Sequence, residues 1–292
     1  MDPILISIGP LALRWYGVLI ALGVVLGAAW TLRAARARGL DGEWLLDTAP
    51  WMVGAGIIGA RIVYVVTSPS AFFGPGGDPL RALYVWEGGI SIHGAVIGIV
   101  LVLWWRARLK GYDVWRYLDV LSPVAALGII GGRIGNFMNG TDTGGRLTDW
   151  AIGFTWPEPG TPTLGAFGRL VFGDPLWQYG PPVCRTVPVG EPCVVHLTPL
   201  YGALVGLLLV GIVAWALARL RTPGAVFLNL VLWYSLLRSV LEEPFRDNPL
   251  FPQVYVDPVG GVGLLTLTQV FSVPLVLISL YLLWVRGAGA ER

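Results

Sequence analysis

The chain has few charged residues for its length. Of its 292 residues, 13% are charged and 55% are hydrophobic, whereas soluble domains carry about 25% charged residues. This scarcity excludes an ordinary soluble domain and indicates a protein that crosses a membrane several times. The formal net charge of +2 says little about partners, and we expect no nucleic acid among them.

Histidine and cysteine are also scarce, with two residues of each type. They form no His/Cys/acid cluster with metal-ligand spacing, so we expect neither a metal site nor a cofactor. The N-terminus has no basic region before the first apolar run, so we do not expect that run to be a cleaved signal peptide. The sequence also has no tandem repeat and no low-complexity tract.

Seven apolar runs are long enough to span a bilayer, for which a helix needs about 20 residues. They cover residues 11–32, 45–67, 89–108, 117–138, 197–219, 223–242 and 263–285. We therefore predict an all-α polytopic membrane protein with seven transmembrane helices. Residues 1–292 form a single membrane domain in this interpretation.

Basic residues are unevenly shared between the two sides of the predicted helices. Eleven follow the first, third, fifth and seventh runs: Arg33, Arg36, Arg38, Arg106, Arg108, Lys110, Arg116, Arg219, Arg221, Arg286 and Arg292. Five follow the other runs: Arg81, Arg146, Arg169, Arg185 and Arg246. The positive-inside rule makes the richer side cytoplasmic, so the N-terminus is expected outside and the C-terminus inside.

One segment between the runs is large, from about residue 139 to 196, and the same topology places it outside. Its Gly, Pro, Trp and Thr content indicates a small inserted subdomain of loops and strands. Leu147–Trp156 is the best strand or hairpin material in it. Cys184 and Cys193 both lie there, and an oxidising exterior favours their pairing, although two free thiols stay an alternative.

The fourth run ends in polar residues at Arg133, Asn136, Asn139 and Asp142. Charged groups inside a membrane cost several kcal/mol, on the order of 2.5–3.5 kcal/mol, so they are functional candidates by default. The glycines among them, at 128, 131, 132 and 135, favour close helix packing or keep the backbone clear of a ligand. Packing alone does not explain an Arg-x-x-Asn-x-x-Asn pattern.

Three intramembrane arginines are predicted at one depth. Arg61, Arg133 and Arg238 each follow their helix start by about 15 residues, or roughly 22–24 Å of a core about 30 Å thick. Tyr16 and His93, on helices running the other way, reach the same level. Three arginines near the outer headgroup boundary indicate a pocket for an anion, most simply a lipid phosphate, which the planar guanidinium binds in pairs of hydrogen bonds.

Internal pairing is the alternative for two of these arginines. Arg238 could pair with Glu242 or Glu243, and Arg61 with Asp47 or a helix carbonyl. For proton transfer, His93 is a candidate base near neutral pH, and Asp142 or Glu242 could serve instead. His196 is interpreted as an interface residue and not as a catalyst.

Several motifs resemble those of the prolipoprotein diacylglyceryl transferases of bacteria. The family signature Gly-Arg-x-Gly-Asn-Phe-x-Asn is matched at residues 132–139. Further matches cover the Arg-Trp-Tyr-Gly, Gly-Ala-Arg and His-Gly motifs and the Arg-Glu-Arg element of the sixth helix, at 14–17, 59–61, 86–94 and 238–246. They bring in Arg246 as a further binding candidate and support the resemblance along the whole chain.

The resemblance implies a multi-pass enzyme of the bacterial inner membrane, active in lipoprotein biosynthesis. It would move the diacylglyceryl group of phosphatidylglycerol to the lipobox cysteine in the signal peptide of a prolipoprotein and release glycerol phosphate. On this interpretation the catalytic residues are Tyr16, His93, Arg133, Asp142 and Arg238. The residues that bind phosphatidylglycerol are Arg61, Arg133, Asn136, Asn139, Arg238, Glu242 and Arg246.

Two departures from the family pattern keep other functions open. Thr141 stands where the family usually has Glu, and a one-residue insertion would align Asp142 with that Glu. The family's His-Pro-Ser-Gln-Leu-Tyr-Glu entry to the fifth helix ends here in Gly202, without the Gln and the Glu. An inactive paralogue that binds lipid or lipoprotein is one alternative, and a transporter of organic anions, which would need polar residues at midplane, is another.

Overall fold

Seven helices in the described part of the chain are long and apolar enough to cross a membrane. A computed structural model describes residues 3–8, 11–85, 89, 91–139, 145–162, 169–170, 173, 176–177, 180–247 and 254–290. The seven are α1 (Trp15–Ala37), α2 (Gly42–Thr67), α4 (Ile92–Lys110), α5 (Val114–Asn139), α7 (Thr198–Arg219), α8 (Ala225–Leu237) with its continuation to Phe245, and α9 (Leu267–Ala290). The predicted class, a mostly helical protein with seven membrane-spanning helices, is confirmed.

The first span begins later than predicted because its expected first turn is a strand. Strand β1 (Ile4–Ile8) pairs antiparallel with β2 (Leu11–Arg14), and α1 follows at once. A short apolar run has the same composition in a strand and in a helix, so hydropathy alone does not separate the two. Arg14, the first residue of the Arg-Trp-Tyr-Gly motif, is the last residue of β2.

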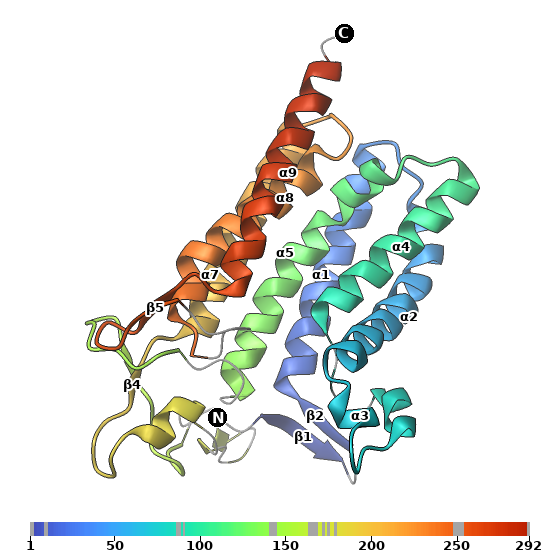
Figure 1. The fold of residues 1–292 in the computed structure, drawn as a ribbon. Helices are drawn as coiled ribbons and strands as arrows, with labels where there is room; N and C mark the ends of the chain where they lie inside the picture. The colour runs from blue at the N-terminus through green and yellow to red at the C-terminus, as the bar shows by residue number, and fades with distance from the viewer. Residues whose placement is uncertain are drawn as a thin grey trace. The chain divides into compact units, whose positions relative to one another are not determined.

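The described residues divide into two compact units, residues 1–31 with 118–292 and residues 32–117. In the larger unit, α7, α8 and α9 run side by side (Figure 1). Its core forms where a stripe of α7 meets α5 and α8. The fully buried members of the stripe recur every three or four residues, as helical packing requires: Val205, Leu209, Val213 and Ala216.

Glycines let α1 and α5 approach closely. A methyl group added at Gly27 would come within 2.6 Å of Val124 Cα, and one at Gly135 within 2.9 Å of Tyr16 Cα. Gly131 meets the backbone of Leu19 in the same way. Gly131 and Gly135 therefore allow close helix packing, which is the first of the two interpretations given for these glycines.

Asp119 is fully buried near the start of α5 and fixes the start of α8. Its carboxylate oxygens accept hydrogen bonds from the backbone N–H groups of Gly224 and Phe227, each at 2.9 Å. The first turn of a helix carries unpaired N–H groups and partial positive charge, so a buried carboxylate is well matched to it. Asp119 of α5 thus caps a different helix, α8, from more than 100 positions away in the chain.

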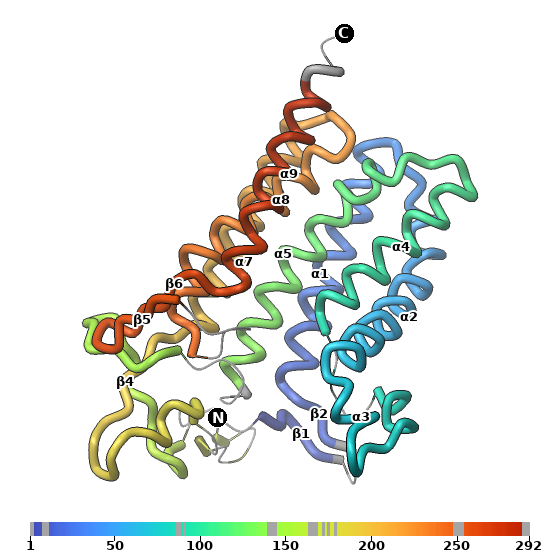
Figure 2. The backbone as a smooth tube through the Cα atoms, in the orientation of Figure 1, coloured from blue at the N-terminus to red at the C-terminus, as the bar shows by residue number. Residues whose placement is uncertain are grey.

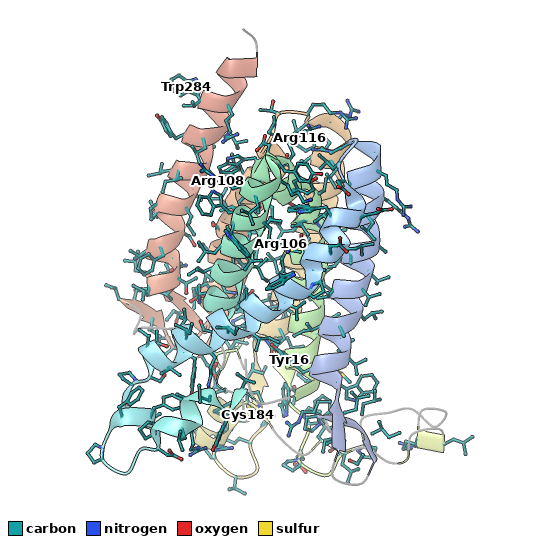
Figure 3. All side chains as sticks on the ribbon, turned by 90° about the vertical axis from the view of Figure 1, so that its right-hand side faces the viewer. Tyr16, Arg106, Arg108, Arg116, Cys184 and Trp284 are labelled. Carbon is teal, nitrogen blue, oxygen red and sulfur yellow. A yellow bond between two sulfur atoms is a disulfide. The ribbon has the colours of Figure 1, made fainter. Side chains whose placement is uncertain are left out.

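Short strands gather at the end of the larger unit where α5 ends and α7 begins (Figure 2). Strand β3 (Phe154–Thr155) pairs with β4 (Val194–Val195), and β5 (Tyr255–Asp257) pairs with β6 (Val262–Leu264) between the α8 continuation and α9. Strand structure was predicted within 147–156, where β3 now lies. Tyr16 and Cys184 lie toward this end of the unit, and Trp284 lies toward the other (Figure 3).

Cys184 and Cys193 form a disulfide, with their Cα atoms 5.5 Å apart. This settles the alternative left open by the sequence in favour of pairing. The bridge joins the short helix η3 (Pro182–Thr186) to the residue before β4. Because Trp156 N–H donates to Cys193 C=O at 2.8 Å, the disulfide also holds the β3–β4 pairing in register.

The smaller unit is built on the packing of α2 against α4, again through glycines. The backbone of Gly94 lies against that of Gly59, and Gly98 lies against Ala55. Between the two helices, the chain forms α3 (Ser70–Phe73) and η1 (Pro79–Leu83). Its basic residues include Arg106, whose Nε donates to the hydroxyl of Thr48 at 3.0 Å (Figure 3).

Candidate active site

Arg133 of α5 reaches across to an acid of the α8 continuation. Its Nη2 lies 2.8 Å from Glu242 Oε1, and the Glu242 side chain is 2% exposed. A buried carboxylate at this distance forms a charge-assisted pair with the guanidinium. The sequence showed no acid near Arg133 in its own segment, and the fold supplies one from a different helix.

The residues that meet Arg133 lie on a π-helical turn, η4 (Arg238–Glu242), which continues α8. Such turns are rare and occur mostly at functional sites. The wider turn brings both following acids to one arginine: Arg238 Nη1 lies 3.3 Å from Glu242 Oε1, and Nη2 lies 3.2 Å from Glu243 Oε2. The pairing alternative for Arg238 is thus present, and the same carboxylate also holds Arg133.

A third arginine completes the group. Arg246 Nη1 lies 3.3 Å from Glu242 Oε1, the oxygen that also contacts Arg133 and Arg238. We call Arg133, Arg238, Arg246, Glu242 and Glu243 the arginine–glutamate cluster. Three guanidinium groups against two carboxylates leave it with one positive charge in excess. Glu243 was not among the sequence candidates for binding, although it directly follows Glu242.

Gly202 of α7 provides the space in which the cluster forms. A Cβ atom at this position would lie 2.6 Å from Glu242 Oε2 and 2.7 Å from both Cδ and Nε of Arg133. Any side chain here therefore collides with the pair. The sequence showed Gly202 only as a departure from a family pattern, and the packing gives the physical reason why a glycine stands there.

Tyr16 lies beside the same part of α5. Gly135, two residues after Arg133, packs directly on the ring and backbone of Tyr16, and the tyrosine side chain remains 37% exposed. Asn136 is half-buried in the next position of α5, and Asn139 is the last residue of that helix. Asp142 lies outside the described residues.

The segment between α5 and α7 is tied to the end of the α8 continuation directly next to the cluster. Arg146 N–H donates to Phe245 C=O at 2.9 Å, and His196 N–H donates to Arg146 C=O at 3.0 Å. Burial lowers the pKa of Arg146, while nearby Asp247 acts in the opposite direction. The backbone at 145–147 therefore bridges Arg246 and β4.

His196 is fully buried at the centre of these connections. Its Nε2 donates to Gly260 C=O at 2.8 Å, and its Nδ1 accepts from the Tyr201 hydroxyl at 3.1 Å. Burial lowers the pKa of the imidazole below its usual value. The ring packs on Trp150 and Phe245, so His196 is a packing residue that joins β4 to the start of α7, and its place at a membrane interface stays a prediction.

Arg61 and His93 belong to the smaller unit. The guanidinium of Arg61 donates to the carbonyls of Ala82 and Gly89, each at 2.9 Å, and to that of Arg81. It is buried and lies over the ring of Phe72, so it fastens the segment before α4 to α2. His93 is exposed in the first turn of α4.

The cluster is suited to binding an anion with several oxygens. Arg133 Nε is buried and has no hydrogen-bond partner among the described residues, so the cluster retains a donor that its own acids do not use. Guanidinium groups bind phosphate through paired, charge-assisted hydrogen bonds. Charges fixed in place before a reaction stabilise a leaving group on which negative charge grows.

Fold and site together define a polytopic membrane protein with a buried arginine-rich centre fit for phosphate chemistry. The family model of prolipoprotein diacylglyceryl transferase matches residues 3–285. The chain belongs to the prolipoprotein diacylglyceryl transferase family.

Curated relatives agree over nearly the full length. The chain is 47% identical over 285 residues to the phosphatidylglycerol–prolipoprotein diacylglyceryl transferase of Thermus thermophilus, covering 98% of each chain. It is 40% identical to the protein of the same name in Deinococcus radiodurans, covering 97% of this chain and 85% of that one. For the Agrobacterium fabrum protein of that name, the identity is 34%, with 96% and 90% covered.

Proposed function

We propose that this chain transfers the diacylglyceryl group of phosphatidylglycerol to the cysteine thiol of a prolipoprotein lipobox. As a member of its family it is a transferase, and its seven apolar helices make it a multi-pass membrane protein. The finer part of the proposal is its place in the bacterial inner membrane, with the N-terminus outside. One membrane domain with an inserted subdomain at about 139–196 also stays a prediction.

The observation that carries the proposal is the meeting of Arg133 and Arg238 on one buried carboxylate, 2.8 and 3.3 Å from Glu242 Oε1. We assign the lipid phosphate to these two arginines, with Arg246 beside them. The excess positive charge favours an anion, and the unused Arg133 Nε offers it a donor. Arg61 already donates to three backbone carbonyls. In this mechanism it therefore holds the segment before α4, and binding of the phosphate depends chiefly on the arginine–glutamate cluster.

Tyr16 and the end of α5 are assigned to the glycerol headgroup. Tyr16 packs against Gly135, while Asn136 lies one residue further along α5 and Asn139 ends the helix. Amide and phenol groups donate and accept hydrogen bonds, as the two hydroxyls of a glycerol headgroup require. These three residues would therefore orient the lipid while the arginines bind its phosphate.

The chemical step is a substitution at carbon. The cysteine thiol loses its proton to a base, because the thiolate is the competent nucleophile. Its sulfur forms a C–S bond with the glyceryl carbon that carries the phosphate oxygen. The C–O bond breaks, and glycerol phosphate leaves with the electron pair and the negative charge. Candidates for the base are His93, Asp142 and Glu242, and Glu242 already contacts three arginines.

Purified protein, phosphatidylglycerol vesicles and a lipobox peptide test this function. We expect a mass increase of one diacylglyceryl group on the peptide cysteine, and none on a peptide with serine in its place. Binding of both substrates without transfer would establish the inactive paralogue instead. Flux of an organic anion into vesicles, without transfer, would establish the transporter.

Arg133→Lys tests the role of the cluster. Lysine keeps the charge but lacks the planar fork that holds Glu242 and a phosphate together. We expect transfer to fall by about a hundredfold, in line with the loss of one preorganised donor at a developing charge. Transfer at the wild-type rate, at equal expression and folding, would remove Arg133 from the site.

A further inference from the structure

The π-helical turn leaves one backbone carbonyl without its regular partner. Glu243 N–H donates to Arg238 C=O, five residues back. In the same pattern the carbonyl of Ser239 would accept from residue 244, but that residue is Pro244, which has no N–H. The Ser239 carbonyl therefore needs a donor from outside the turn.

Gln269 of α9 supplies this donor. Its Nε2 donates to Ser239 C=O at 2.9 Å. The two residues are 30 positions apart in the chain, and α8 and α9 run side by side (Figure 1). This hydrogen bond connects the side-chain amide of Gln269 to the π-helical turn that carries Arg238 and Glu242.

The other half of the same amide is fixed by the start of α9. Gln269 Oε1 accepts from Thr266 N–H at 3.1 Å, and Gln269 N–H donates to Thr266 Oγ1 at 3.2 Å. This reciprocal arrangement is a capping box, in which the third helical residue and the capping residue satisfy each other. It fixes which end of the amide faces Thr266, so the NH₂ group must face Ser239.

We propose that Gln269 is a positioning residue, which holds the π-helical turn in the geometry that presents Arg238, Glu242 and Glu243 to Arg133. The inference rests on the proposed function for its catalytic consequence. Without the amide donor, the partly buried carbonyl of Ser239 loses its partner and the turn rearranges to find another. Arg238 and Glu242 begin and end that turn, so their contacts change with it.

Gln269→Glu separates this role from the capping of α9. Glutamate retains the oxygen that accepts from Thr266, since Glu serves in capping boxes as well as Gln does. It replaces the NH₂ donor by a second oxygen that faces the Ser239 carbonyl. Thr266→Val is the matched control, because it removes the capping hydroxyl from the same helix start and leaves the amide of Gln269 free to reach Ser239.

We expect Gln269→Glu to lower kcat for diacylglyceryl transfer by about ten- to hundredfold, the effect of leaving a partly buried polar group unpaired and facing a second oxygen. KM for the lipobox peptide should stay within a few-fold, since the peptide does not contact Gln269 in this proposal. Thr266→Val should lower Tm at least as much while kcat stays near wild type. Equal kcat in wild type and Gln269→Glu, or an equal loss in both variants, would overturn the positioning role.

Hydrogen exchange makes the inference independent of activity. We expect a peptide that spans 238–245 to exchange faster in Gln269→Glu than in Thr266→Val or wild type. If wild-type protein transfers no lipid, the proposed function fails, and this exchange difference still decides whether Gln269 holds the turn. Identical exchange in all three proteins would overturn the inference while leaving the transfer activity untouched.

Discussion

A single methyl group at Gly202 should disrupt the arginine–glutamate cluster. The added Cβ of Gly202→Ala would lie 2.7 Å from Arg133 Cδ and Nε, and 2.6 Å from Glu242 Oε2, whereas ordinary contacts begin at 3.4 Å. To relieve the clash, the side-chain ends of Arg133 and Glu242 must shift by about 0.7 Å, and we expect this shift to disturb their 2.8 Å contact.

The size of the effect follows from this displacement. Overpacking a close-packed interior costs about 1–3 kcal/mol, and a misplacement of about 1 Å at a catalytic group lowers rates by up to about a hundredfold. We therefore expect Gly202→Ala to reduce transfer to the lipobox peptide by about ten- to hundredfold. The loss should appear in kcat, because in the proposed mechanism the cluster acts on the leaving phosphate.

Gly211→Ala is the control on the same helix, since nothing lies within 4 Å of a Cβ at that position. Alanine favours helix over glycine by about 1 kcal/mol, so this variant should be as stable as wild type or more stable, with unchanged transfer. Both variants are assayed in detergent with phosphatidylglycerol, and folded protein is measured by Tm. Wild-type kcat in Gly202→Ala would refute the reasoning, because the cluster would then tolerate the displacement.

Three further predictions concern stability. Asp119→Asn removes the buried charge at the start of α8 and should lower stability by about 1–3 kcal/mol, whereas Asn at the exposed Asp47 should leave Tm unchanged; equal Tm values in the two variants would contradict the cap. Cys184→Ser opens the bridge to Cys193 and should destabilise the subdomain by about 2.5–3 kcal/mol, seen as faster limited proteolysis there than in wild type; an unchanged cleavage rate would contradict this. Burial lowers the pKa of His196 below its usual 6.5, so the unfolded chain binds the proton first, and stability present above pH 6.5 is lost as the pH falls below it. The Tm of wild type should therefore fall more between pH 7.5 and 5 than that of His196→Asn, and parallel slopes would disprove the role of this histidine.

The seven spans and the shared level of Arg133 and Arg238 could be predicted from the sequence. Apolar length sets a helix's ability to cross a bilayer, and the seven predicted spans differ from the observed ones by five residues or fewer at either end. Counting depth along the fourth and sixth helices, which run in the same direction, placed Arg133 and Arg238 at one level, and they share a carboxylate oxygen. Depth says nothing about rotation around a helix axis, so Glu242 as their common partner required the fold.

Other features depend on backbone detail that hydropathy does not record. The π-helical turn shifts Glu243 toward Arg238, and its signal in the sequence, Pro244 at the end of an apolar run, also fits a plain helix end. The sequence gives no signal for the role of Gln269, because its partner Ser239 is 30 residues away in the chain. The strand β2 was taken as helix because apolar composition alone does not separate the two.

The shared carboxylate has a consequence for product release. Glu242 contacts all three arginines of the cluster, so in the proposed mechanism an arriving lipid phosphate would compete with this carboxylate for the same guanidinium groups. Such competition weakens the grip on the departing glycerol phosphate, whose dianionic form would bind most tightly to three unopposed arginines. On the proposed mechanism, the Glu242 carboxylate would therefore reduce inhibition by the released glycerol phosphate.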